Sequence, residues 1–378
     1  MRKRRVMIVA GEASGDMHGA RLVRAMRHAD PELDFFGIGG SAMRQAGVRI
    51  RVDNAHIATV GVSEALLKLR LLAAALRTAK SDLAQFHPQL LIVIDFPDFN
   101  LRVAAAAKNL GIPVMYYISP QIWAWRTGRV KKIKKVVDHM VVIFPFEAAF
   151  YEKWNVPVTF VGHPLLDVAE RRSPASGKSN VRMDGTVIGL LPGSRNEEVL
   201  RLLPTMVKVA ERLSKEIPDA VFPIPVASSV DAGAVSRIAE QSEARCMIVS
   251  DRLHEVLKKA TLLITASGTV TLEAALAGTP MIVIYRVSGL SYWLGKRLIR
   301  VRHIALANLV AGRAIVPELI QHEATVERIS KKALSLISDE HALAAMQKQL
   351  GRVARLLGAA GASRRAADVA MKLLSADG

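Results

Sequence analysis

Residues 5–16 read Arg-Val-Met-Ile-Val-Ala and then Gly-Glu-Ala-Ser-Gly-Asp, so an apolar run ends abruptly in a polar loop. A short run with β-branched side chains predicts a buried strand rather than a helix. Comparable runs start at Leu90, Pro113 and His139, and a helical pattern follows each of them. This alternation predicts parallel strands joined by crossover helices.

The second half of the chain repeats the pattern after a polar stretch at residues 171–186, whose helix breakers predict a linker. Further strands are expected at residues 187–191, 221–226, 246–249, 262–265 and 281–284, and the chain turns wholly helical after Thr325. We therefore expect an α/β protein with two Rossmann-like, doubly wound parallel-sheet domains. The expected bounds are 1–170 and 187–339, with the C-terminal helices 340–378 packed back on the first domain or swapped within a homodimer.

Composition limits the class of protein. The chain has 378 residues, a formal net charge of +18 and 51% hydrophobic residues, which excludes global disorder and favours two domains. Because Cys246 is the one cysteine, no intramolecular disulfide can form, and a reducing, cytoplasmic setting is expected.

Two membrane signals are missing from the sequence. The basic start Met1–Arg5 precedes the apolar run Val6–Ala10, which is shorter than the roughly 7–15 residues of a signal-peptide core. No apolar stretch reaches the roughly 20 residues that span a bilayer. We therefore expect a protein that is soluble or peripheral to a membrane.

Polar loops follow the predicted strands in both halves of the chain. They are Gly11–Asp16, Asp95–Asp98, Ser119–Trp125, Pro192–Arg195 and Ser267–Glu273. Ligands of open α/β sheets bind beyond the carboxyl ends of the strands. The sequence therefore predicts a ligand cleft between the two domains.

The loops of the second half suit a nucleoside diphosphate. Ser267–Thr269 opens a helix whose N-terminal amides attract anions, and Gly268 lets a ligand approach the backbone. Glu273 can accept hydrogen bonds from a ribose, and Arg195 can neutralise phosphate charge. The alternatives are an ordinary helix cap and a solvated arginine.

The loops of the first half suit a different ligand. Gly11–Asp16 has neither the G-x-G-x-x-G spacing nor a Walker lysine, so sugar hydroxyls or a proton acceptor fit it better. Of Asp95 and Asp98, one is either a helix cap or a general base for a hydroxyl nucleophile. Trp123 and Trp125 either pack in the core or contact a sugar or lipid. The sequence contains no D-x-D, H-E-x-x-H, C-x-x-C or G-x-S-x-G motif, so we expect no tightly held metal.

Together these loops resemble those of the lipid-A-disaccharide synthase family, inverting glycosyltransferases of the two-domain GT-B architecture. The matching stretches, in chain order, are GEASGD (11–16), DFPDFN (95–100), SPQIWAW (119–125), VGHPLLD (161–167), LPGSR (191–195), ASGTVTLEAAL (266–276) and ANLVAGRAIVPELIQ (307–321). They cover most of the chain. One departure is Ala307, where the family pattern leads us to expect proline; it affects loop rigidity rather than chemistry.

The resemblance implies transfer of 2,3-diacylglucosamine from UDP-2,3-diacylglucosamine to the 6-hydroxyl of 2,3-diacylglucosamine 1-phosphate. The products are UDP and the β-1,6-linked lipid A disaccharide 1-phosphate. Asp98 is the implied general base, with Glu12 as the alternative, and no cofactor or metal is implied. The residues implied on the acceptor side are Ser14, Asp16, Asn100, Trp123 and Trp125. Those implied around UDP and the donor are Gly193, Ser194, Arg195, Ser267, Gly268, Thr269, Thr271, Glu273, Asn308, Glu318 and Gln321.

Acylated substrates imply contact with an anionic bilayer, at the inner face of the bacterial inner membrane. An interfacial helix is predicted at residues 65–76, where Lys68 and Arg70 interrupt Leu66, Leu69 and Leu72. Further basic contacts are expected from Lys131, Lys132, Lys134, Lys135, Arg297 and Arg300. The alternative is that all of these lie on ordinary solvated helix faces.

Three rival functions remain open at this point. A UDP-N-acetylglucosamine 2-epimerase or the peptidoglycan transferase would share the fold, but the order of the loops argues against both. A catalytically silent membrane adaptor would share the basic helices. A nucleic-acid-binding protein would share the charge, but here the basic residues alternate with aliphatic rather than stacking aromatic side chains. We therefore expect no nucleic-acid partner.

Overall fold

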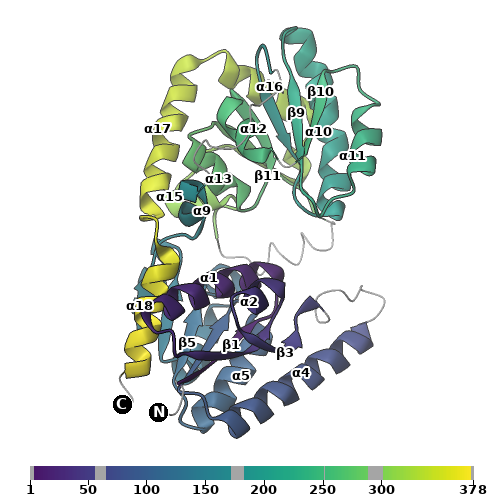
Figure 1. The fold of residues 1–378 in the computed structure, drawn as a ribbon. Helices are drawn as coiled ribbons and strands as arrows, with labels where there is room; N and C mark the ends of the chain where they lie inside the picture. The colour runs from purple at the N-terminus through teal and green to yellow at the C-terminus, as the bar shows by residue number, and fades with distance from the viewer. Residues whose placement is uncertain (1–3, 56–64, 172–182, 251, 288–300, 376–378) are drawn as a thin grey trace. The chain divides into compact units, whose positions relative to one another are not determined.

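The computed structural model describes residues 4–55, 65–171, 183–250, 252–287 and 301–375, without the side chains of residues 65–68 and 169–171. The chain forms two compact units (Figure 1). The first consists of Met1–Ser173 and Leu357–Gly378, and the second of Pro174–Leu356. Most of the predicted linker 171–186 lies outside the described residues.

The first unit is built on a seven-stranded sheet with parallel pairings throughout. Its strands are β1 (Arg5–Ala10), β2 (Asp34–Gly39), β3 (Arg49–Asp53), β4 (Leu90–Ile94), β5 (Val114–Tyr117), β6 (His139–Val142) and β7 (Val158–Phe160). They lie in the order β3-β2-β1-β4-β5-β6-β7. The four strands predicted here are confirmed. Strand β2 and the two edge strands were not predicted; β3 alternates charged with apolar residues, and β7 has only three residues.

Helices cover both faces of this sheet (Figure 1). They are α1 (Ala13–Ala29), α2 (Ser41–Gln45), α4 (Ala65–Phe86), α5 (Pro97–Asn109), α6 (Ile122–Trp125), α7 (Val130–Val136), α8 (Pro145–Glu152), α9 (Leu165–Arg171) and α18 (Ala362–Ser375), with a 3-10 turn, η2 (Thr127–Arg129). On one face, Leu83 of α4, Val103 of α5 and Ile133 of α7 share a core with the strands. On the other face, α1 packs against α2 and α18.

The second unit is also a parallel α/β structure. Its strands are β8 (Ile188–Leu191), β9 (Phe222–Val226), β10 (Cys246–Ser250), β11 (Leu262–Ala266), β12 (Met281–Tyr285) and β13 (Glu318–Ile320). One sheet has the order β13-β12-β11-β8, and a parallel bridge from Val187 to Val221 connects it to the pair β9 and β10. The strands predicted in this half are confirmed, and β13 is a further strand that was not predicted.

Long and short helices surround this second sheet. They are α10 (Asn196–Glu216), α11 (Ala232–Ala239), α12 (Leu253–Lys259), α13 (Val270–Ala277), α15 (Leu306–Ala311), α16 (Val326–Ile337) and α17 (Glu340–Leu356), with a 3-10 turn, η3 (Gln321–Glu323). The predicted helical end of the chain after Thr325 is confirmed.

The C-terminal helices divide between the two units. The sequence analysis grouped residues 340–378 with the first domain, but α17 packs on α13 and α15 of the second unit. The reason is its apolar face, because Met346, Leu350 and Val353 are buried there. Only the last of these helices, α18, packs on α1 of the first unit.

Candidate active site

The order of the strands reverses at one point in each unit, and the predicted loops leave the sheets there. In the first unit Ala10 at the end of β1 pairs with Ile94 at the end of β4. In the second unit Leu191 at the end of β8 pairs with Thr265 near the end of β11. Such switch points are where open α/β sheets bind ligands. The structure therefore brings the loops together in pairs, 11–16 with 95–98 and 192–195 with 267–269.

The two loops of the first unit interlock through Phe96 and Gly11. A Cβ atom on Gly11 would lie 2.3 Å from Cδ1 of the Phe96 ring, so the ring fits only against a glycine. This contact places the two residues beside it, Glu12 and Asp95, in one another's electrostatic reach. Both carboxylates were expected from the sequence, but their proximity follows only from the fold.

Asp95 and Phe96 both have left-handed backbone, with φ of 46° and 48°. Such a conformation costs about 1–3 kcal/mol for each non-glycine residue and persists only where the surroundings impose it. Here the Tyr116 hydroxyl and the Asn100 side-chain amide each donate to the Asp95 carbonyl oxygen, both at 2.6 Å. The turn after β4 is therefore a strained structure held by two buried side chains.

The environment of Asp95 changes its acidity. Burial, and secondarily the nearby charge of Glu12, raise the pKa of Asp95 to about 6, against a backbone hydrogen bond at Phe96 that lowers it. The Tyr116 phenol is fully buried, and burial raises its pKa well above the usual value, so it stays protonated and able to donate. A carboxylate of this kind is ionised at neutral pH and still basic enough to accept a proton.

Asp98, the predicted base, lies in the first turn of α5 and is more exposed. Its side chain is 72% accessible to solvent. It forms an ion pair with Arg129 of η2 and lies 3.9 Å from the Arg126 guanidinium. The predicted alternative Glu12 is also exposed, at the N-cap of α1.

Two residues predicted for the acceptor side, Asp16 and Asn100, make hydrogen bonds to the backbone of the first unit. The Asp16 carboxylate is buried and accepts hydrogen bonds from the backbone amides of Gly40, Ala42 and Met43, at 2.7, 2.9 and 3.1 Å. Asn100 is fully buried and donates to the Ile94 and Asp95 carbonyl oxygens. Ser14 is exposed in the first turn of α1.

The predicted tryptophans differ from one another. Trp123 is half-buried and donates from Nε1 to Oε1 of Glu147 at 3.1 Å, with its ring edge-on to Phe146. Trp125 is exposed, and the Arg126 guanidinium lies 4.3 Å from the centre of its ring. Burial raises the pKa of Glu147 to about 8, although the bonds from Trp123 and from two backbone amides lower it. Glu147 is a residue that the sequence analysis missed.

In the second unit the loop after β8 is shaped by Gly193. Its φ of 122° is unfavourable for other residues, and a Cβ atom there would lie 2.6 Å from Oε2 of Glu198. The loop is also held by a hydrogen bond from the Ser229 hydroxyl to the Ser194 carbonyl at 2.9 Å. Arg195 is exposed at the N-cap of α10.

The loop after β11 leads into α13, as predicted. Thr269 is the N-cap, and the buried Thr271 hydroxyl donates to the Gly268 carbonyl at 2.9 Å. A Cβ atom on Gly268 would meet nothing within 4 Å, so the backbone here is open to an approaching group. Glu273 follows in the first turn and is half-buried.

Two further residues predicted for the donor site, Asn308 and Glu318, support this loop. Asn308 is fully buried, accepts from the amides of Ile315 and Val316, and donates to the Val316 carbonyl and to Glu318. Glu318 accepts from the amides of Ile304 and Ala305, and Ser267 donates to the Ile304 carbonyl at 3.0 Å. The chain of bonds connects Ser267 with Glu318 and Asn308.

Gln321 closes a separate turn at the end of β12. Its side-chain oxygen accepts from the Val287 amide at 2.8 Å, and its side-chain nitrogen donates to the Val287 carbonyl at 3.1 Å. Gln321, Asn308 and Glu318 therefore shape the loops of the second unit.

Two histidines of the first unit, the half-buried His18 and the buried His163, lie close to one another. Burial first, and the charge of Arg21 second, lower the pKa of His18 to about 4. Burial, and then the proximity of His18, lower the pKa of His163 to about 4. Both histidines are therefore neutral at pH 7, and neither was assigned a role from the sequence.

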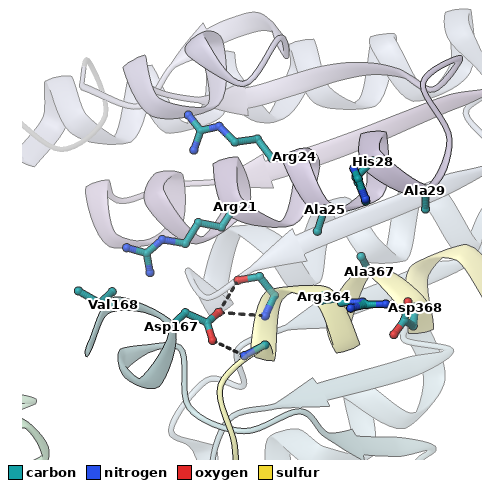
Figure 2. Close-up of a pocket in the computed structure, with 12 residues that line it drawn as sticks. Arg21, Arg24, Ala25, His28, Ala29, Asp167, Val168, Arg364, Ala367 and Asp368 are labelled. Carbon is teal, nitrogen blue, oxygen red and sulfur yellow. Dashed lines mark hydrogen bonds between the residues drawn. The ribbon is translucent and has the colours of Figure 1, made fainter. Parts of the chain in front are cut away.

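Beside the two histidines, a pocket of about 900 Å³ opens between α1 and α18 (Figure 2). Arg21, Arg24 and Arg364 contribute cationic side chains to its lining. Asp167 at its edge accepts hydrogen bonds from the amides of Gly361, Ala362 and Ser363, at 2.6, 3.2 and 3.4 Å. Asp167 therefore caps α18 and anchors it to the first unit.

The residues predicted to touch a membrane fall into three groups. Leu69 is 63% exposed and Arg70 is exposed, both on α4, whereas Leu72 packs against the core of the first unit. The lysines of α7 are exposed while its Val130 and Ile133 are buried, so the helix has one basic face; these lysines are Lys131, Lys132, Lys134 and Lys135. The side chains of Leu66, Lys68, Arg297 and Arg300 lie outside the described residues.

Within the described parts of the chain, no helix combines the length and apolar character needed to cross a bilayer. Among the same residues, no three His, Cys, Asp or Glu side chains are grouped as metal ligands would be.

A family profile described as lipid-A-disaccharide synthetase matches residues 6–373. The chain belongs to the lipid-A-disaccharide synthase family. It is 47% identical over 376 residues to the lipid-A-disaccharide synthase of Trichlorobacter lovleyi, covering 99% of this chain and 98% of that one. It is 45% identical to the enzyme of the same name from Geobacter sulfurreducens, covering 98% of this chain and 97% of the other. The chain is therefore a glycosyltransferase of lipid A disaccharide synthesis.

Solved structures of similar fold include the glycotransferase of kitacinnamycin, with a TM-score of 0.68 and 17% identity over 99% of this chain and 100% of that one. Another is the UDP-GlcNAc 2-epimerase of Neisseria meningitidis bound to UDP-GlcNAc, with a TM-score of 0.65 and 12% identity. The match covers 97% of this chain and 100% of that one. At these identities the similarity concerns the fold, and the expected GT-B fold is confirmed.

Proposed function

We propose that the protein transfers 2,3-diacylglucosamine from UDP-2,3-diacylglucosamine to the 6-hydroxyl of 2,3-diacylglucosamine 1-phosphate, with inversion at the anomeric carbon. The products are UDP and the β-1,6-linked lipid A disaccharide 1-phosphate. The observation that carries this proposal is membership of the family over residues 6–373, which include both switch points. A structural neighbour that is bound to UDP-GlcNAc supports a nucleotide-sugar donor.

The second unit is proposed to hold UDP. The amides at the start of α13 and the exposed Arg195 supply positive charge, and Gly268 leaves room for a diphosphate. These groups offset the charge that develops on the departing UDP, so the reaction needs no metal ion. Glu273 in the first turn of α13 accepts from the ribose hydroxyls.

The first unit is proposed to hold the acceptor, beside the loops after β1 and β4. These two loops carry three carboxylates. Asp98 and Glu12 are the bases predicted from the sequence, and Asp95 is half-buried. One of them takes the proton as the hydroxyl attacks.

Contact with an anionic membrane surface at the cytoplasmic face is proposed to give access to the acylated substrates. Exposed Leu69 and Arg70 on α4 support this, together with the basic face of α7. Both helices pack against α5 and cover the same face of the sheet. Each basic residue near such a surface contributes about 1 kcal/mol.

The donor site is tested by two substitutions in a turnover assay that measures UDP release. Gly268→Val should weaken UDP binding at least about tenfold while leaving the melting temperature unchanged, because a Cβ atom at this position meets nothing within 4 Å in the free protein. Arg195→Gln should lower kcat on the order of 10²–10³-fold, as for the loss of a transition-state donor.

Gly351→Val is the matched control for the first substitution, since a Cβ atom there also meets nothing within 4 Å. Unchanged UDP affinity in Gly268→Val and unchanged kcat in Arg195→Gln would contradict the proposed donor site.

A further inference from the structure

The pocket between α1 and α18 collects arginine side chains from two helices of the first unit. Arg21 and Arg24 extend from α1 and Arg364 from α18 (Figure 2). Within the part of the chain that the structure describes, none of their guanidinium groups forms an ion pair or a hydrogen bond. The exposed Arg44 and Arg49 of the same unit, by contrast, are each paired with an aspartate. The pocket therefore holds cations that the protein itself does not neutralise.

The two carboxylates in the lining of the pocket leave this positive charge in place. Both oxygens of Asp167 accept hydrogen bonds from the start of α18, namely from Gly361, Ala362 and Ser363. Asp368 is exposed and, among the described residues, forms no ion pair. Three guanidinium groups thus accompany a single carboxylate that is not already engaged. Guanidinium groups bind phosphate oxygens in pairs, so a phosphate group is the anion that this lining fits best.

The size and the remaining walls of the pocket indicate more than a bare phosphate ion. Small apolar side chains complete the lining between the arginines, and they are Ala25, Ala29, Val168 and Ala367. The volume of about 900 Å³ lies within the roughly 300–1,000 Å³ of small-molecule sites. Such a mixture of cationic and apolar groups suits a phosphate group that is joined to an organic body.

The pocket is separate from the proposed acceptor site and from the proposed membrane face. Arg24 follows Glu12 by 12 residues, which is about 18 Å along α1 at a rise of 1.5 Å per residue. The helices α4 and α7, with the exposed Leu69 and the basic lysines, cover the opposite face of the sheet. A ligand in the pocket therefore lies away from the acceptor loops and away from the proposed bilayer contact, which favours a soluble compound over a lipid headgroup.

We propose that the pocket between α1 and α18 binds a soluble organic phosphate of about the size of a sugar phosphate, at a site distinct from the transferase centre. Arg21 and Arg24 hold the phosphate group from α1, and Arg364 holds it from α18. The small apolar side chains contact the organic part. Because the ligand contacts both helices, its binding stabilises the packing of α18 on the first unit. This proposal stands whether or not the function proposed above is correct.

The test measures amide hydrogen exchange in α18 (Ala362–Ser375) of the full chain while glucose 1-phosphate is titrated. Exchange in this helix should slow in a saturable manner, with a Kd of about 1 mM or below, because the bound ligand opposes local opening. Glucose is the matched probe without the phosphate group and should leave exchange unchanged. Higher salt should weaken the effect, since the recognition is largely electrostatic.

Two substitutions identify the site. Arg24→Gln and Arg364→Gln should each weaken the binding of glucose 1-phosphate about tenfold, as expected for the loss of a hydrogen bond between charged groups. Both side chains are exposed, so the melting temperature of the free protein should not change. The matched control is Arg102→Gln, which removes an exposed arginine from α5 and should leave the affinity unchanged.

Several results would overturn the proposal. They are an absence of saturable protection in α18, an equal effect of glucose, unchanged affinity in both Arg24→Gln and Arg364→Gln, and an equal loss in Arg102→Gln. A lipid source of the phosphate is tested with phosphatidylglycerol vesicles. If these vesicles protect α18, if Arg24→Gln and Arg364→Gln abolish that protection, and if glucose 1-phosphate has no effect, the pocket binds a lipid headgroup and the soluble ligand is excluded. None of these results bears on turnover of the acylated substrates.

Discussion

The ring of Phe96 packs on Gly11, with Cδ1 only 2.3 Å from the point that a Cβ atom of residue 11 would occupy. This contact joins the loops that follow β1 and β4, which carry Glu12 and Asp95. A side chain at residue 11 would therefore clash with Phe96, whereas a Cβ atom at some other glycines would meet nothing within 4 Å.

Gly11→Ala should therefore displace Phe96 and disturb the turn that carries Asp95. We expect a loss of about 1–3 kcal/mol in the free energy of unfolding, the range for an overpacked site, together with a fall in kcat. Urea unfolding and UDP release measure the two effects. Gly128→Ala is the control, because a Cβ atom there meets nothing within 4 Å. Equal stability and activity of the two variants would show that the contact is unimportant.

Asp167 holds α18 on the first unit, so Asp167→Ala should loosen that helix. The loss of an N-cap acceptor costs about 0.5–2 kcal/mol, and amide hydrogen exchange should accelerate in Ala362–Ser375 before the sheet is affected. Asp368→Ala removes an exposed carboxylate from the same helix and should leave exchange unchanged (Figure 2). Unaltered exchange in Asp167→Ala would contradict the anchoring role.

The buried histidines predict a pH dependence of stability. The pKa of His18 is about 4 in the folded chain against an ordinary value of 6.5, so the unfolded chain binds the proton first as the pH falls. Stability is therefore lost between pH 6.5 and 4, by about 1.4 kcal/mol per pH unit for each such histidine. His163 contributes in the same direction.

His18→Gln should flatten this loss, measured as the free energy of unfolding in urea at pH 7, 6 and 5. His341→Gln, at an exposed position on α17, is the control and should follow the wild type. Asp95 and Glu147, whose pKa values are raised, act in the opposite direction but are common to all three proteins. Parallel curves for His18→Gln and wild type would contradict the burial of a neutral imidazole.

The basic face of α7 predicts binding to anionic vesicles. Replacing Lys131 and Lys132 by glutamine should weaken sedimentation with phosphatidylglycerol vesicles by about 1 kcal/mol per charge, and the binding should fall as salt is raised. The control is the double variant Lys331→Gln/Lys332→Gln, which removes the same charge from two exposed lysines of α16. It should have little effect on vesicle binding. An equal loss in both double variants would mean that net charge, rather than α7, determines binding.

Much of the fold could be predicted because fully buried parallel strands are continuous apolar runs, as in Arg5–Ala10 and Leu90–Ile94. The site loops could be predicted because they follow those strands. The roles of Asp95 and Asn308 could not, since Tyr116 imposes the turn at Asp95 and four hydrogen bonds occupy the Asn308 side chain. Asp167 meets its partners 194–196 residues away in sequence, beyond any local pattern.

The most direct measurement is UDP release from UDP-2,3-diacylglucosamine, with the acylated or the unacylated glucosamine 1-phosphate as acceptor. Our account predicts release only with the acylated acceptor, in step with formation of a β-1,6-linked disaccharide 1-phosphate. Release that is independent of acylation, or conversion of UDP-N-acetylglucosamine without an acceptor, would contradict it.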